Sequence, residues 1–590
     1  MTRPFSCTFP LAMLGLLAVP ASGQVEPLGE LGKRIELVHQ RLLKGETPAF
    51  TQDFILADVM LRPDYPRRFD EYSGDLSGRY VGAVAMLPPP GGRATLEELV
   101  KELVRYQKGD GRFGNEALVY SPEAIDKDHM ALLWGNGRLL VGLLEYLEGG
   151  SDDEVLAVAR RLGDFLVSVQ ESCANEAVQK RVEDFGAAGM ICFSHLIEGL
   201  VMLADATGDQ TYVAAAEEIV PWFPVARGHQ HTHGYLTTLR AILMLHEATG
   251  RSGYFDMVER LYDELVQSPD YLIYGGVKEY FGGRGDRDEG CSEADFLRLS
   301  LQLWKATGNV EYLERAERCL LNQFYANQFV SGDFGHQLIF EQGIAPYHGT
   351  GRAWWCCTMH GLRAFRDVLD ALVYVNNDVV RVVLFQDARW SQGDTTLLLE
   401  RDVSADRQCY FAVTVERAPE NGVKLALRKP RWAEAMALEV DGQAVKATEQ
   451  DGYMVLGAPL KKGSRVEVTF SLKTELVLRD GTRIVPEDLP AEGAEAAVFH
   501  GPWLMGVDEA YDPLFFGEPW GDNRILLRPE NKGDAVTGGA FGLPVARIWC
   551  TYTHGGFPDV QSVVLRPISE RTAHEQATCA VWLRCRPAGR

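Results

Sequence analysis

The stretch AILMLHEATGRSGYFDMVERL, at residues 241–261, shows the pattern that decides the fold: an apolar helical run, a break at Gly250, and a second amphipathic run. The pattern recurs with breaks at Gly150, Gly208 and Gly308. Glycine at each break suits a helix C-cap, where a positive φ is needed. Repeated helical hairpins of this kind indicate either a solenoid or a closed ring of hairpins.

The linkers between the hairpins are long and irregular, which favours a closed ring over a stack of nearly identical units. We therefore predict an (α/α)6 toroid over residues 24–372. From 373 to 475, short alternating β-branched runs separated by turn residues predict a β-sandwich. Residues 476–590 mix such runs with Gly- and Pro-rich loops and predict a second β-rich domain. The expected fold class is multi-domain α plus β.

Composition and charge limit the partners of the chain. A length of 590 residues is too great for one hydrophobic core and predicts about two to four domains. The net charge of −23 argues against a nucleic-acid partner, because phosphate binding needs clustered Lys and Arg.

The first residues have the layout of a cleaved secretory signal, which we place at 1–23. Arg3 is followed by an apolar run at about 9–19 and by small residues at 21–23. The run is too short to span a bilayer, and the sequence offers no other candidate span. We expect export to the periplasm or the medium; the alternative is a short buried N-terminal helix.

Two neighbouring cysteines need a special explanation. Cys550, Cys579 and Cys585 lie near the C-terminus, where a disulfide is the ordinary expectation. Cys356 and Cys357 are adjacent, and adjacent cysteines rarely bond each other without backbone strain.

A metal site is the explanation that the neighbouring motifs favour. Glu289 and Cys291 lie in an acid-rich loop at 271–296, and Cys356 and Cys357 follow about 65 residues later. One carboxylate and three thiols form the kind of tetrahedral set that zinc prefers. His360 is an alternative fourth ligand. The other interpretation is that the cysteines are small buried apolar residues.

These residues together resemble the retaining β-L-arabinofuranosidase family of glycoside hydrolases. Members carry a Glu-x-Cys pair and a Cys-Cys pair that hold zinc, matched here by Glu289, Cys291, Cys356 and Cys357. A Gly-Gly-Val/Ile stretch precedes the acid/base glutamate of the family, and GGVKEYF, with Glu279, matches it. The resemblance covers nearly the whole mature chain.

The resemblance implies a role for each matched residue. Cys356 would be the nucleophile and Glu279 the acid/base, while His195, His229 and His233 would orient the hydroxyls of an oligo- or polysaccharide substrate. Several alternatives stay open at this point. Asp286 or Asp288 could replace Glu279 as the acid, and His195 could be an ordinary core histidine. We expect His231 to be solvated.

Departures from the family pattern leave the sugar open. Thr358-Met359-His360 replaces the Pro-Pro-Asn of many members, and Ala188-Gly189 replaces a His-Glu pair. The expected product is a terminal β-L-arabinofuranose or a related sugar. Two other functions remain: another toroid enzyme, such as an unsaturated-uronyl hydrolase or a lyase, or a non-catalytic carbohydrate-binding protein with a structural zinc.

Overall fold

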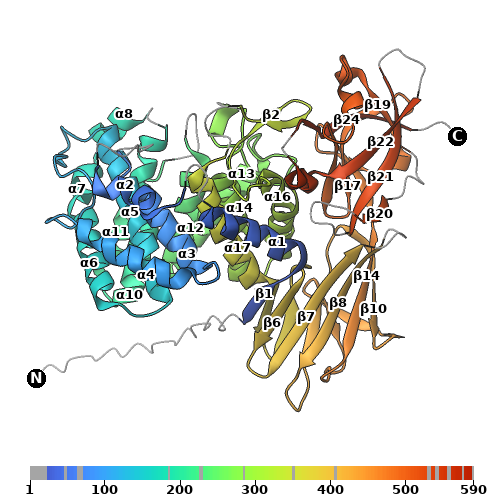
Figure 1. The fold of residues 1–590 in the computed structure, drawn as a ribbon, viewed down its shortest axis with the longest axis horizontal. Coiled ribbons are helices and arrows are strands. Elements are labelled where there is room, and N and C mark those ends of the chain that lie inside the picture. The colour runs from blue at the N-terminus through green and yellow to red at the C-terminus, as the bar shows by residue number, and fades with distance from the viewer. Residues whose placement is uncertain are drawn as a thin grey trace, which may run out of the picture.

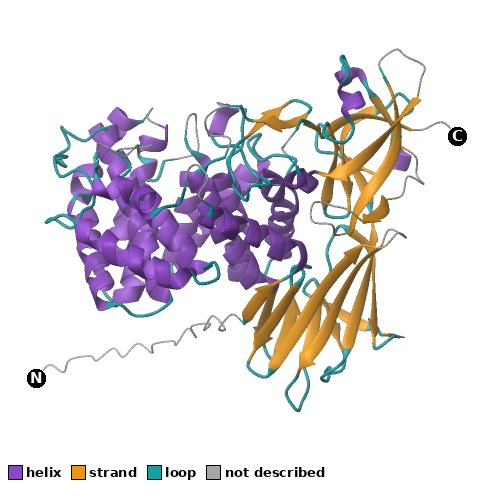
Figure 2. Ribbon diagram, in the orientation of Figure 1, coloured by secondary structure: helices purple, strands orange, loops and turns teal. Residues whose placement is uncertain are grey.

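The computed structural model separates a helical body from sheets that follow it in the chain (Figure 1, Figure 2). It describes residues 23–44, 49–62, 71–183, 186–224, 230–283, 286–348, 353–403, 408–527, 533–537, 544–554, 560–574 and 577–587. Apart from its last residue, the predicted signal at 1–23 lies outside these ranges. In the ranges described, none of the helices has the length and apolarity that crossing a membrane requires.

An inner ring of helices forms the centre of the helical body. Its members within the described residues are α3 (Asp75–Met86), α5 (Lys127–Glu148), α10 (Leu196–Thr207), α12 (Thr232–Thr249), α14 (Gly290–Thr307) and α17 (Trp355–Leu372). Each contacts the next along the chain, and α17 contacts α3, which closes the ring. The sequence alone allowed either a solenoid or a closed ring of hairpins. The contact between α17 and α3 closes the ring and shows that the fold is a toroid.

An outer layer of helices covers the ring, and each contacts at least one inner helix. Its members are α1 (Gly29–Leu43), α4 (Gly92–Leu103), α6 (Asp153–Ser168), α11 (Thr211–Ile219), α13 (Ser252–Gln267) and α15 (Val310–Cys319). Shorter helices complete the body: α2 (Gln52–Met60), α7 (Gln170–Cys173), α8 (Glu176–Val182), α9 (Ile191–Ser194) and α16 (Tyr325–Asn327). In α13, Val258, Leu261, Tyr262 and Leu265 are buried, which is the apolar stripe of a helix that packs on one side only.

Three of the four predicted glycine breaks are helix C-caps. Gly208, Gly250 and Gly308 end α10, α12 and α14 with φ of 73°, 70° and 70°. The fourth hairpin differs, because α5 is capped by Gly149 with φ −82° and Gly150 follows it. The cap is therefore displaced by one residue from the predicted break.

Tyrosines from three of the repeats join successive outer helices. The Tyr212 hydroxyl of α11 donates to Asp164 of α6 at 2.8 Å. The Tyr254 hydroxyl of α13 donates to Glu217 of α11 at 2.9 Å. Tyr312 of α15 repeats the contact with Glu259 of α13, also at 2.9 Å. The repeat thus connects each outer helix to the one before it.

Two sheets follow the toroid, at the lower right of Figure 1. The order of the first is β1 (Gln24–Pro27), β6 (Ala388–Gln392), β7 (Thr395–Val403), β8 (Gln408–Arg417), β14 (Arg465–Leu472), β10 (Ala433–Val440) and β11 (Gln443–Ala444). The order of the second is β12 (Ala447–Gln450), β13 (Tyr453–Leu456), β9 (Lys424–Arg428), β5 (Val379–Val382) and β4 (Val373–Asn376). In the core that these sheets enclose, the ring centroid of Phe385 lies 4.9 Å from those of Phe411 and Phe470.

A third sheet ends the chain. Its strands are β15 (Thr474–Leu478), β16 (Arg483–Ile484), β17 (Ala494–His500), β18 (Trp503–Asp508), β19 (Arg524–Leu527), β20 (Gly533–Thr537), β21 (Pro544–Thr553), β22 (Val560–Pro567), β23 (Cys579–Ala580) and β24 (Trp582–Pro587), with β2 (Gln337–Phe340) and β3 (Gly343–Pro346). Pairing runs through β17, β24, β19, β21, β22 and β18 and returns to β17, so these strands form a closed ring.

Three short strands from the range predicted for the toroid pair with the later sheets. β1 pairs with β6, with Gln24 opposite Ser391, as the blue strand beside β6 in Figure 1 shows. The β2–β3 hairpin joins the third sheet through β23. The predicted fold class, a helical toroid followed by β-sandwich-like sheets, is confirmed.

The expected C-terminal disulfide does not form between Cys579 and Cys585, both of which are buried thiols. Cys579 lies on β23 and Cys585 on β24. Burial raises the pKa of Cys579 to about 12 and also raises that of Cys585, so both behave as small apolar core residues.

Candidate active site

The four predicted metal ligands meet where two neighbouring inner helices begin. Glu289 is the N-cap of α14 and Cys291 lies in its first turn, while Cys356 and Cys357 lie in the first turn of α17. Because α14 and α17 are adjacent in the ring, the two starts lie side by side. One ligand atom from each of the four residues lies within 4.8 Å of all the others.

The geometry of this cysteine cluster fits a thiolate-rich metal site. Cys291 Sγ lies 3.7 Å from Cys357 Sγ. Two sulfurs that share a tetrahedral zinc at about 2.3 Å stand about 3.8 Å apart. The cluster is buried, and Cys356 is its most exposed member at 8%, against 0% for both other cysteines. The four residues could therefore hold a metal ion, with Cys356 the sulfur that a substrate could reach.

Neighbouring groups favour a negative charge on Cys356. Burial opposes ionisation, but hydrogen bonds from the other two thiols and the charge of Arg79 hold the pKa of Cys356 well below its usual range. Burial raises the pKa of Cys291 and Cys357, and the charge on Cys356 raises both further. Arg79, from α3, reaches the cluster with Nη1 3.9 Å from Cys291 Sγ. The starts of two helices add their positive dipole ends.

A second group joins the cluster to Glu279. His231, Glu279 and Glu289 offer ligand atoms that all lie within 4.8 Å of one another. The prediction that His231 is solvated was wrong: it is buried at the N-cap of α12, with Nε2 3.1 Å from Glu289 Oε2. Burial opposes its charge, yet Glu289 raises the pKa of His231 above its ordinary value.

Glu279, from the loop at 271–296, lies in this second group beside Glu289. The Arg287 guanidinium holds the Glu279 carboxylate with two donors: Nε donates to Oε2, and Nη2 donates to Oε1 at 2.6 Å. His336 Nε2 lies 3.7 Å from the same Oε1. Both alternatives lie elsewhere. Asp288 accepts the backbone N–H of Gln337 at 2.7 Å and the amide of Asn327, so it supports the scaffold.

The other alternative, Asp286, is exposed, and its backbone carbonyl accepts the N–H of Ile339 at 2.6 Å. It belongs to neither group of candidate ligands found among the described residues around Glu289. Of the three acids that the sequence left open, Glu279 alone lies in a group with Glu289 in the described part of the chain.

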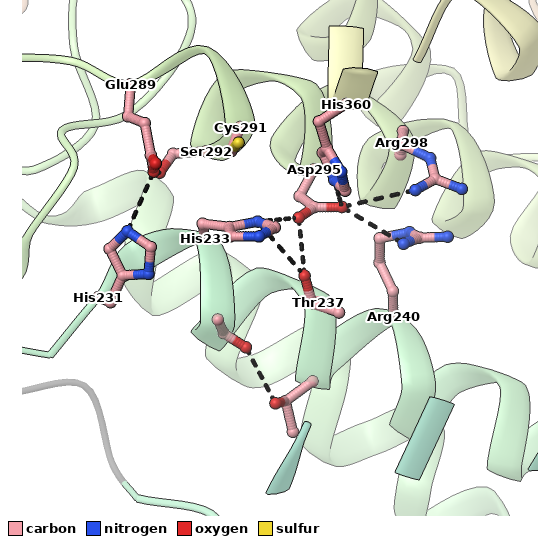
Figure 3. Close-up of polar contacts among 12 residues, drawn as sticks. His231, His233, Thr237, Arg240, Glu289, Cys291, Ser292, Asp295, Arg298 and His360 are labelled. Atoms are coloured by element: carbon pink, nitrogen blue, oxygen red, sulfur yellow. Dashed lines mark hydrogen bonds and ion pairs between the residues drawn. The ribbon is translucent and has the colours of Figure 1, made fainter. Parts of the chain in front are cut away.

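A third group is centred on Asp295 of α14 (Figure 3). Its carboxylate accepts from His233 Nδ1 at 2.6 Å and from Thr237 at 2.7 Å, and His360 Nε2 lies 3.0 Å from its Oδ1. Arg240 and Arg298 add positive charge, with Arg240 Nη1 3.3 Å from Oδ1. His360, the alternative fourth ligand, is thus a partner of Asp295.

His233 connects this group to Arg79. Arg79 Nη2 donates to His233 Nε2 at 3.1 Å, and His233 Nδ1 then donates to Asp295. An arginine can only donate, so the bond fixes His233 as the tautomer with its proton on Nδ1. Burial lowers the pKa of His233, which agrees with a neutral ring.

His195 lies beside the same group. It is fully buried between α9 and α10, with its ring 4.2 Å from that of Trp134. Neither ring nitrogen has a hydrogen-bond partner among the described residues. Burial holds the pKa of His195 well below its ordinary value. His229, the third predicted sugar-binding histidine, lies outside the described residues.

Two protein-family models match this chain and identify the family to which the site belongs. Residues 70–370 match the model of the "Beta-L-arabinofuranosidase, GH127 catalytic domain", and residues 379–472 match that of the "Beta-L-arabinofuranosidase, GH127 middle domain". The chain belongs to family GH127. It is therefore a glycoside hydrolase of the β-L-arabinofuranosidase type, and the resemblance noted in the sequence is confirmed.

Solved GH127 structures share the fold of the whole chain. The structure of a GH127 β-L-arabinofuranosidase from Geobacillus stearothermophilus T6 has a TM-score of 0.70 at 14% identity, covering 95% of this chain and 100% of that one. A second GH127 β-arabinofuranosidase has a TM-score of 0.68 at 15% identity, covering 96% and 98%. No curated protein matches the sequence. At these identities the likeness shows the fold.

Four residues that the sequence did not single out complete this GH127 site: Arg79, Trp134, Arg287 and His336. Arg79 also bonds Asp75 four residues earlier, at 2.8 Å. An acid and a base at that spacing on a helix are usually a surface pair, so the sequence carries no signal for a buried one. Arg287 and His336 contact Glu279 from two different segments, and the chain fold alone brings them together.

Proposed function

We propose that this GH127 member releases a terminal β-L-arabinofuranose, or a related sugar, with retention of anomeric configuration. Cys356 is the nucleophile and Glu279 the acid/base. The observation that carries the proposal is the cysteine cluster, in which three sulfurs and a Glu289 oxygen lie within 4.8 Å of one another. Cys356 keeps the greatest exposure among them.

Zinc is the cofactor that the donor set fits best, since three thiols and one carboxylate form a soft tetrahedral set. Glu289, Cys291, Cys356 and Cys357 would hold it. When bound, zinc supplies the positive charge that keeps its thiol ligands deprotonated at neutral pH.

Two displacement steps account for retention. In the first, Cys356 Sγ forms a bond to the anomeric carbon while the bond to the leaving oxygen breaks, and Glu279 gives that oxygen its proton. In the second, Glu279 takes a proton from water, the water oxygen bonds the anomeric carbon, and the carbon–sulfur bond breaks. Two inversions restore the starting configuration, and Cys356 leaves as a thiolate.

The surrounding residues fit these steps. Arg287 and His336 hold the Glu279 carboxylate in place. His195 is a neutral ring with two open nitrogens, which suits a sugar hydroxyl that both donates and accepts. Trp134 provides an aromatic face beside it.

Metal and stereochemistry can be tested in one preparation. The full chain, purified under reducing conditions, is expected to hold about one zinc per chain. NMR of the first product formed from an aryl β-L-arabinofuranoside is expected to show the β anomer. A zinc-free active enzyme, or an α anomer as first product, would rule the proposal out.

We further propose that residues 1–23 direct export. Mass spectrometry of the protein secreted by a bacterial host is expected to give a mature chain that begins near Gln24. A chain that stays in the cytoplasm with residues 1–23 attached would contradict export.

A further inference from the structure

Apart from the active site, a cavity of about 540 Å³ lies where the outer toroid helices meet the later sheets. It shares no lining residue with the three groups of the active site. Its walls come from α13 and α15, from the loop after β9, from β15 and β16, and from the turn between β17 and β18. Its volume lies within the range of about 300–1,000 Å³ that small-molecule sites occupy.

Arg318 brings a cation into this cavity without a matching carboxylate. Its Nη2 donates to the Ile273 carbonyl at 2.8 Å, and its guanidinium lies 4.5 Å from the centre of the Phe499 ring. Its Nε has no hydrogen-bond partner among the described residues, and no described carboxylate forms an ion pair with it. Burial lowers the pKa of Arg318, and the nearby Arg483 lowers it further. Arg318 as a whole is only half-buried and lines the cavity, so a ligand there can meet its unpaired charge.

The four acids that line the cavity are already engaged. Glu311 pairs with Arg431 at 3.0 Å and Glu314 with Arg428 at 2.8 Å. Glu475 serves two cations, Lys473 at 3.2 Å and Arg483. Glu317 pairs with Arg428 and accepts the Trp432 indole N–H at 2.8 Å. Glu475 acts on Arg318 through its charge alone, without a direct ion pair. The cavity lining as a whole holds five basic residues against four acids, which leaves an excess of positive charge.

Aromatic side chains supply flat surfaces beside these charges. Tyr271, Trp432 and Phe499 all line the cavity. Arg318 covers one face of Phe499, whereas the Trp432 indole is fixed by its bond to Glu317. A fixed aromatic ring beside hydrogen-bonding groups suits a sugar ring, whose C–H faces stack while its hydroxyls bond at the edge.

We propose that this cavity binds a sugar unit that carries a carboxylate, a uronic acid residue, as a second carbohydrate site outside the active site. Arg318 and Arg483 bind the carboxylate, and Trp432 and Tyr271 contact the sugar ring. A guanidinium matches the planar carboxylate well. A phosphate would bring about two negative charges next to Glu475 and Glu317, so a singly charged carboxylate fits better.

Calorimetric titration of the full chain with a trimer of galacturonic acid, which contains no arabinose, tests this site. We expect saturable binding that Arg318→Gln and Arg483→Gln each weaken by roughly tenfold or more. Arg483 is 51% exposed, so its variant keeps the test open if Arg318→Gln does not fold. Hydrolysis of an aryl arabinofuranoside is expected to stay unchanged in both variants.

The matched control is Arg417→Gln, an arginine on β8 that is 60% exposed and pairs with Asp394 at 3.1 Å outside the cavity. It should bind the trimer as the unaltered chain does. If a neutral galactose trimer bound equally well, the site would not recognise the carboxylate. If inorganic phosphate bound equally well, the site would not recognise the sugar ring. Binding that neither cavity variant alters, or no binding, would refute the site.

Discussion

His231 Nε2 lies 3.1 Å from Glu289 Oε2, so an imidazole from the N-cap of α12 holds the carboxylate of the cysteine cluster. Glu289 itself occupies the N-cap position of α14. A positive charge on His231 is compatible with its burial, because Glu289 supplies the opposite charge. Burial alone would raise the pKa of Glu289, but the charge of His231 holds it well below its ordinary value. Such a partner fixes the orientation of a ligating carboxylate.

Removal of this partner should weaken the proposed zinc site. His231→Ala is expected to lower zinc affinity by roughly 10- to 100-fold, since loss of a group that orients a ligand has effects of that size. Competition with a chromophoric chelator measures the affinity. His246→Ala, near the other end of α12, is the control and should change nothing. Equal affinity in both variants would mean that Glu289 does not need His231.

Glu279 should matter most for substrates with poor leaving groups. Glu279→Gln removes the proposed proton donor, and we expect kcat/KM to fall by about 10²- to 10⁴-fold for an alkyl arabinoside. A dinitrophenyl arabinoside needs little protonation, so formation of the glycosyl-enzyme should fall far less. Asp286→Asn, an exposed acid in the same loop, is the matched control. A uniform loss across leaving groups would argue against acid catalysis by Glu279.

Burial of His195 predicts a dependence of stability on pH. Its pKa is held well below 6.5, so the ring is neutral in the folded chain and takes up a proton near pH 6.5 on unfolding. Stability is therefore lost as the pH falls below about 6.5, by up to about 1.4 kcal/mol per pH unit from this one group.

Urea unfolding of the unaltered chain and of His195→Phe, at pH 7 and at pH 5.5, measures this contribution. The variant is expected to lose less stability over that interval. Parallel losses in the two proteins would show that His195 is not the neutral buried group described above.

The tyrosine contacts of the outer ring should be separate and additive. Tyr212→Phe and Tyr312→Phe each remove one hydroxyl that donates to a carboxylate of the preceding outer helix. Each should lower the free energy of unfolding by about 1 kcal/mol, and the double variant by the sum. Urea unfolding at pH 7 measures all three. A double variant much less stable than the sum would indicate that the ring transmits strain between the pairs.

Local patterns predicted the elements of this fold better than they predicted its long-range contacts. Gly208, Gly250 and Gly308 mark helix ends because a C-cap is a local requirement. Adjacent cysteines rarely bond each other, so the Cys-Cys pair indicated a metal site, and the resemblance to the family then implied the four ligands. The strand at 24–27, in contrast, is too short for a periodic signal, and only its distant partner β6 defines it.

The surroundings of the cluster could not be predicted for the same reason. His231 lies in a polar stretch, HQHTH, that is typical of solvent exposure, and the neighbouring start of α14 is what buries it. His360 has the spacing of a ligand from Cys356, one helical turn later, but that turn directs it to Asp295. Sequence spacing fixes which residues share a helix face, not which neighbour that face meets.

The most direct test of the account is to trap the sugar on the proposed nucleophile. Glu279→Gln slows the second step, so brief incubation with a dinitrophenyl arabinofuranoside should leave one pentosyl unit on the enzyme. Trypsin releases AWWCCTMHGLR, residues 353–363, in which fragmentation separates Cys356 from Cys357. We predict the pentosyl unit on Cys356, and none when Cys356→Ser is added. A pentosyl unit on a glutamate or on Cys357 would contradict the account.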